Sequence, residues 1–118
     1  MAYGATLATV RSDRGTEFDL LARITARLGQ ASRNGPAAFR NLVEVLGENR
    51  RFWNRLAVDV AHPDNALPQP LRAQIFYLYE FVEHQSGKVL RDGADPASLI
   101  DINKAVMRGL QPMKGQSE

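Results

Sequence analysis

The sequence predicts an all-α protein, a single-domain antiparallel bundle of about four helices with a short N-terminal segment that is helical or extended. Three observations support this prediction. Apolar residues recur at steps of three and four over long stretches, which is the period of an amphipathic helix. Proline and glycine mark helix starts and stops. No segment alternates apolar and polar residues as a half-buried strand does, and short connections favour antiparallel neighbours.

The length of 118 residues suits one domain with a real core and is too short for two. We therefore expect one helical domain over residues 1–118. Within it, residues 1–14 are predicted to form an N-terminal arm, and residues 111–118 are predicted to be a disordered tail.

The first helix is predicted to begin at Thr16 and to end between Gly29 and Ala31. Thr16-Glu17-Phe18-Asp19 fits a capping pattern and places acidic residues in the positively polarised first turn.

A long helix is predicted from Pro36 to Ala61 or His62, because Pro63 cannot continue it. Its apolar seam runs for roughly 24 residues, or about 36 Å. The seam consists of Phe39, Leu42, Leu46, Asn49, Trp53, Leu56 and Val60. Asn49 is its one polar member, so Asn49 either fixes register against another helix or lies where the seam opens to water.

The third helix, Pro68 to Leu90, is expected to be the central one. It begins with prolines suited to a first turn, and Gly93 is predicted to cap its end in the left-handed conformation. One face carries Leu71, Ile75, Leu78, Val82 and Val89. Further aromatic side chains, Phe76 among them, lie off that face. We therefore expect neighbours on at least two sides, or one side kept for a partner outside the chain.

The last helix is predicted to start with Asp95 as N-cap and Pro96 as first helical residue, and to stop at Gly109. The side chains predicted to form the structural core come from the last three helices. They are Leu46, Trp53, Leu71, Leu78, Val82, Leu99, Ile102 and Val106.

The residues of a catalytic or metal site are missing from the sequence. There is no cysteine, and His62 and His84 are the only histidines. Glu80 and His84 are four apart, which fails the Glu-x-x-His spacing of di-iron bundles, and no glycine-rich phosphate loop is present. We expect a protein that is not an enzyme and that binds no cofactor.

The chain shows neither a spanning apolar segment nor a secretory signal, so we expect a cytoplasmic protein that does not enter a membrane. Its formal net charge of +2 is small and argues against nucleic acid as a partner. Binding of RNA stays open as an alternative. Arg40, Arg50, Arg51 and Arg55 lie on the long helix with aromatic residues interleaved, as in an RNA-binding patch. Glu44 and Glu48 dilute this patch.

An ordered set of short motifs extends over most of the chain. The set consists of Ala2-Tyr3, Glu17…Leu21…Ile24-Thr25…Leu28, Asn49-Arg50…Trp53, Pro63-Asp64-Asn65-Ala66-Leu67-Pro68, Leu71-Arg72-Ala73, Phe81-Val82, Val89-Leu90 and Leu99-Ile100-Asp101-Ile102-Asn103…Gly109-Leu110. In this order and spacing, the sequence resembles the FlaF family of alphaproteobacterial flagellar biosynthesis regulators.

The resemblance implies a non-enzymatic cytoplasmic protein that binds flagellin as a secretion chaperone or adaptor. It also implies a post-transcriptional activator of flagellin production that acts opposite FlbT, and it leaves FlbT open as a further partner. The alternative function is direct binding of flagellin messenger RNA through the four arginines.

Flagellin's terminal segments are amphipathic helices, and a helical groove can cover such a face. Asn49, Phe76 and Tyr79 are the predicted partner-binding residues, with Asp64 and Asn65 as a recognition corner at the turn. The sequence leaves the oligomeric state open, because a bundle or a dimer would satisfy the long seam equally.

Overall fold

The computed structural model describes the backbone of residues 7–31 and 35–110 and the side chains of residues 15–31 and 37–109. Four helices make up this part of the chain, and it contains no strand. They are α1 (Leu7–Ala31), α2 (Gly35–Ala61), α3 (Gln69–Asp92) and α4 (Ala97–Leu110). The predicted all-α bundle is confirmed. The predicted tail at 111–118 and the first six residues of the predicted arm lie outside the described residues.

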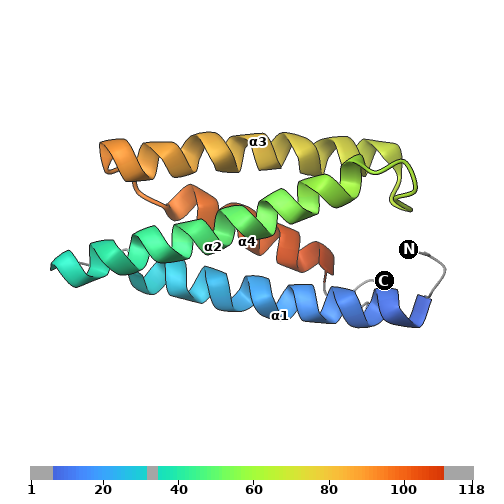
Figure 1. Cartoon of the computed structure of the whole chain (residues 1–118), viewed down its shortest axis with the longest axis horizontal. Helices are drawn as coiled ribbons and strands as arrows, with labels where there is room; N and C mark the ends of the chain where they lie inside the picture. Colours follow the sequence, from blue (N-terminus) through green and yellow to red (C-terminus); the bar gives the residue numbers. More distant parts are fainter. Residues whose placement is uncertain (1–6, 32–34, 111–118) are drawn as a thin grey trace.

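The helices run alternately up and down (Figure 1), and the molecule measures 47 × 27 × 26 Å. α1 and α3 lie on opposite sides, and α2 crosses between them and contacts both. α4 packs mainly against α1 and touches α3 only slightly.

α1 begins at Leu7, so the predicted start at Thr16 is wrong. The helix passes through Thr16 without a break. A Ser/Thr-x-x-Asp/Glu pattern is compatible with a helix interior as well as with a helix start. The upstream apolar residues Leu7 and Val10, which already stand at helical spacing, extend the same helix.

The end of α3 and the start of α4 agree with the sequence prediction. Gly93 follows α3 with φ 70° and ψ 23°, and its N–H bonds to the carbonyl of Lys88. The Asp95 carboxylate accepts a hydrogen bond of 2.9 Å from the N–H of Ala97 and thereby caps α4.

A buried polar network joins α1, α2 and α4 through one side chain, Asn103. Its Oδ1 accepts a hydrogen bond of 2.9 Å from Nε1 of Trp53. Its Nδ2 donates to Oδ1 of Asn49 at 2.8 Å and to Oγ1 of Thr25 at 3.1 Å. Thr25 in turn donates to the carbonyl of Leu21. Of the two alternatives for Asn49, the structure selects the first: Asn49 is fully buried and bonds another helix.

The apolar core surrounds this network. Leu46, Trp53, Val82 and Leu99 are buried as predicted. The other predicted core residues that pack against this cluster are only partly buried: Leu78, Ile102 and Val106.

The prediction that Leu71 belongs to the core is wrong, because 41% of its surface is exposed. It lies on the apolar face of α3 as its spacing indicates. No helix covers that face at this end of the bundle, because α4 is short and packs mainly against α1.

The expectation that the third helix is central is also wrong. α3 buries only Val82, Ser86 and Val89, whereas α1 and α2 each pack closely against two other helices. The apolar content of α3 correctly indicated a broad apolar surface. It could not indicate whether neighbours long enough to cover that surface exist in the chain.

Replacing Asn103 by alanine should lower the free energy of unfolding by about 2 to 4 kcal/mol, because Trp53 Nε1 and Asn49 Oδ1 would both lose a buried partner. Urea denaturation measures this change. The matched control is the exposed neighbour Lys104→Ala, for which we expect less than about 0.5 kcal/mol. Equal effects of the two substitutions would show that the network contributes nothing.

Two glycines should respond to alanine with opposite signs. Gly87 lies inside α3, and a methyl group there would meet only the flexible end of Arg91, 2.7 Å from Nη1. Gly87→Ala should raise stability by about 0.5 to 1 kcal/mol through helix propensity. Gly93→Ala should lower it by about 1 to 2 kcal/mol, because alanine is strained at φ 70°. Thermal unfolding of both variants checks the signs.

Candidate functional site

The turn between α2 and α3 is built by two side chains, Asn65 and Arg72. Asn65 Nδ2 donates to the carbonyl of Asp59 at 2.9 Å, and its Oδ1 accepts from the N–H of Leu67 at 3.0 Å. Arg72 Nε donates to the carbonyl of Val60 at 2.9 Å, and Nη2 donates to that of His62 at 3.2 Å. The carbonyls at the end of α2 are thereby satisfied by α3.

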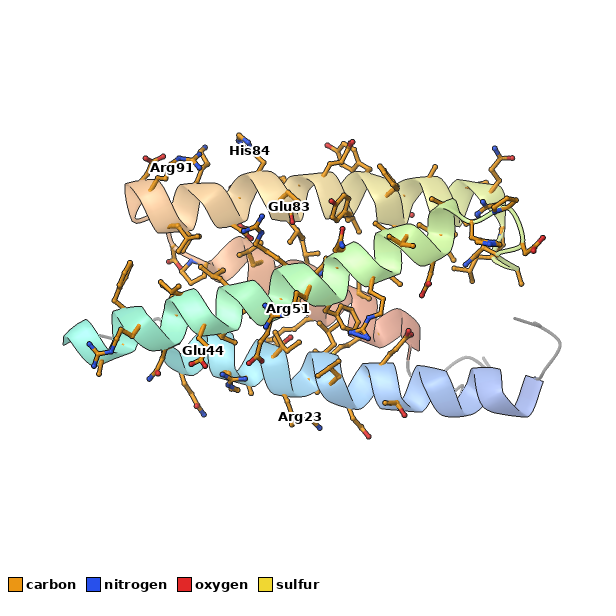
Figure 2. The ribbon with its side chains drawn as sticks, viewed as in Figure 1. Arg23, Glu44, Arg51, Glu83, His84 and Arg91 are labelled. Atoms are coloured by element: carbon orange, nitrogen blue, oxygen red, sulfur yellow. The ribbon has the colours of Figure 1, made fainter. Side chains whose placement is uncertain are left out.

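Two further polar contacts hold α3 along the same side of α2. Tyr79 donates its hydroxyl to Oδ1 of Asn54 at 3.4 Å, a long bond. Arg50 donates to both carboxylate oxygens of Glu83, at 3.2 and 2.8 Å. This hydrogen bond with Glu83 is the main cause that raises the pKa of Arg50. In Figure 2, Glu83 points towards α2, whereas His84 and Arg91 point away from the bundle.

A second side of α3 is formed by the residues that directly precede Arg72, Tyr79 and Glu83 in the sequence. Successive helical residues differ by about 100°. Leu71, Leu78 and Val82 precede Arg72, Tyr79 and Glu83, respectively. They therefore lie a quarter turn or slightly more away from the side bound to α2. Val82 and Val89 on this side belong to the same buried cluster as Leu99 of α4.

The same side is uncovered towards the start of α3. We call Leu71, Ile75 and Leu78 the open stripe. These residues continue the line of Val82 and Val89, yet Ile75 and Leu78 are only half-buried and Leu71 is exposed. No residue of α3 before Val82 is buried.

The length of α4 explains this gap. α3 has 24 residues and α4 has 14, which correspond to about 36 Å and 21 Å. Only residues 93–96 separate the two helices, so α4 starts beside the end of α3. The first ten or so residues of α3 thus extend beyond α4, with α2 beside them (Figure 1).

Aromatic side chains add to the exposed apolar surface of this half of α3. Phe76 is 38% exposed and Tyr77 is 67% exposed. Phe76 stacks edge-on against Tyr79, with ring centroids 5.6 Å apart. Together with Leu71, three large apolar side chains within seven residues are exposed, on different sides of the helix.

The predicted partner-binding residues fall into two groups. Phe76 and the half-buried Tyr79 lie on the uncovered half of α3, and Asp64 is exposed at the turn. Asn65 uses both polar groups of its side chain within the turn, and Asn49 is fully buried. A partner could reach Asn49 only if the bundle opened. Contact with a partner remains a prediction for all five residues.

The four arginines of the alternative patch do not form one surface. Arg50 turns towards Glu83 on α3. Arg40, Arg51 and Arg55 are exposed on α2, and their helical spacing places Glu44 on the same face of the helix. The positive charge on this side is therefore sparse and interrupted.

Within the described residues, no group of three or more His, Asp or Glu side chains is placed to hold a metal ion. None of the helices in this part of the chain combines the length and the apolar content needed to cross a bilayer.

The sequence interpretation assigned Leu71 to the core and passed over Tyr77. A comparison of the predicted helix lengths could have indicated the exposure of Leu71, because the last helix was already too short to cover the third. Periodicity along one helix carries no such signal.

Arg72→Met should lower the free energy of unfolding by about 1 to 2 kcal/mol, because the carbonyls of Val60 and His62 lose their donors while most of the side chain is kept. Asn65→Ala should have a similar effect through the turn. Chemical denaturation measures both, with the exposed Gln74→Ala as control. Wild-type stability of both variants would contradict the assigned role of the turn.

Comparison with known proteins identifies the family. The model of the flagellar protein FlaF family matches residues 1–110. No curated protein and no solved structure matches the chain significantly. The family match covers nearly all of the chain, including every element of the site described above. The protein therefore belongs to the FlaF family of flagellar proteins.

Proposed function

We propose that this FlaF-family protein binds flagellin in the cytoplasm as a secretion chaperone or adaptor, and that it thereby promotes flagellin production after transcription, opposite FlbT. Membership of a flagellar family supports the flagellar part of this proposal. Flagellin as the partner follows from what the family resemblance implies.

The observation that supports a binding role is the uncovered half of α3. Leu71, Phe76 and Tyr77 are exposed there, beside the half-buried Ile75 and Leu78. Apolar surface of this kind serves a protein that covers the apolar face of another helix. Flagellin before assembly has such faces to cover at its terminal helices.

The arrangement of polar contacts fits the same role. Arg72, Tyr79 and Glu83 hold α3 on α2 along one side. Because these bonds do not involve the open stripe, a partner can cover the stripe without breaking the attachment of α3.

The test is co-purification with flagellin from the same organism, comparing two matched double variants. Leu71→Glu with Tyr77→Glu changes the uncovered half of α3, where the two side chains are 41% and 67% exposed. Phe39→Glu with Val43→Glu changes similarly exposed side chains, 53% and 42%, at the opposite end of α2. We expect at least a tenfold loss of affinity for the first pair, because burying a carboxylate in an apolar contact is costly.

The second pair should bind within about threefold of the wild type, and both pairs should unfold cooperatively. Absence of any complex between the wild-type protein and full-length flagellin at micromolar concentration would contradict the proposal. Truncation of either end of flagellin would then show which terminal segment is held.

The RNA alternative is checked on the same preparation. Arg51→Glu with Arg55→Glu should leave flagellin binding unchanged. If the protein instead binds flagellin message, this pair should abolish that binding, which should also weaken steeply with salt.

A further inference from the structure

We propose that α3 opens from the bundle as a unit, while α1, α2 and α4 stay folded against one another. We call α1, α2 and α4 the three-helix unit. This opening costs less free energy than unfolding of the whole bundle, so it recurs in the native protein. The proposal concerns how the bundle opens, and it does not depend on flagellin as the partner.

The buried polar residues separate α3 from the other helices. Four are buried among the residues whose side chains the structure describes. Thr25, Asn49 and Asn103 belong to α1, α2 and α4 and are joined by the hydrogen bonds of Asn103. The fourth, Ser86 of α3, is fully buried, and its Oγ has no hydrogen-bond partner in the described part of the chain. Opening of α3 relieves the cost of this unpaired hydroxyl, whereas movement of α4 breaks three buried bonds.

The helix contacts divide in the same way. α3 packs on α2, touches α4 only slightly and does not pack against α1. α1 packs against both α2 and α4. Opening of α3 therefore breaks mainly one helix contact and leaves the contacts within the three-helix unit in place.

The polar contacts between α2 and α3 are weak individually. Arg50 is exposed and Glu83 half-buried, and an ion pair open to water contributes little stability. The bond from Tyr79 to Asn54 is long, at 3.4 Å. The bonds of Arg72 are partly buried, but they lie beside the turn, where the chain already joins the two helices.

The apolar core loses little when α3 opens. Val82 and Val89 are the two fully buried apolar side chains that α3 contributes. Larger buried side chains, Leu21, Trp53 and Leu99 among them, belong to the three-helix unit. Since the stabilisation from burial grows with apolar area, most of it stays with that unit.

Native-state hydrogen exchange of the full chain, read by mass spectrometry of peptic peptides, tests the proposal. We expect residues 78–90 of α3 to exchange as one group and at least tenfold faster than residues 45–57 of α2, after correction for intrinsic rates. Exchange of residues 78–90 should also rise less steeply with urea, because opening one helix exposes less surface than global unfolding. Equal protection of the two stretches, or faster exchange in α4 than in α3, would overturn the proposal.

Two variants separate local opening from global unfolding. Ile24→Val removes a buried methylene from α1, which does not pack against α3. It destabilises the native and the α3-open protein equally, so residues 45–57 should exchange about fivefold faster and residues 78–90 less than about twofold faster. Val89→Ala shortens a buried side chain of α3 itself and should accelerate both stretches. A bundle that opens only as a whole would show acceleration of both stretches with either variant.

Replacement of Ser86 tests the physical cause. Ser86→Ala should slow exchange of residues 78–90 at least fivefold, because it removes the unpaired hydroxyl. Gly87→Ala, the neighbouring control, changes helix propensity alone and should slow the same stretch about threefold. Acceleration by Ser86→Ala, or a slowing of no more than about twofold, would contradict the proposal.

Discussion

Asn103 fixes where α4 lies, and most other features of the bundle follow from that placement. Its amide bonds to Trp53 and Asn49 of α2 and to Thr25 of α1, all in the buried interior. An amide buried in an apolar core has few alternative positions in which its polar atoms are satisfied. α4 is therefore held against α1 and α2 in one register, and α3 is left to pack on α2 with little help from α4.

This placement divides α3 into two halves with different roles. The second half has α4 beside it and contributes Val82, Ser86 and Val89 to the interior. The first half has α2 beside it and is held there by polar bonds from Arg72 and Tyr79. Polar contacts thus hold this half beside α2, and its apolar side chains Ile75 and Leu78 pack against the core only in part.

The sequence predicted what is decided locally. The left-handed Gly93 and the cap at Asp95 depend on a few neighbouring residues, and the boundaries of α2 follow from its prolines and its long seam. The exposure of Leu71 and the lateral position of α3 depend on which helix reaches which surface. Asn49 lies between these cases: its seam position allowed either a partner on another helix or exposure to water, and only the folded bundle shows that Asn49 is buried and bonds Asn103.

The size of the open stripe limits how tightly a helix could be held. Burying a large aliphatic side chain completely contributes about 1.5 to 3 kcal/mol, and Ile75 and Leu78 are already half-buried. Because association costs at least about 4 kcal/mol, a partner has to bury apolar side chains of its own against these three before any net affinity remains. A single helix on this stripe would therefore bind weakly and exchange quickly. Under the proposed function, a weak hold would allow flagellin to be released for export. In the proposed function, additional affinity for flagellin would have to come from a second contact, and Phe76 and Tyr77 are exposed on the same half of α3, on other sides of the helix than the stripe.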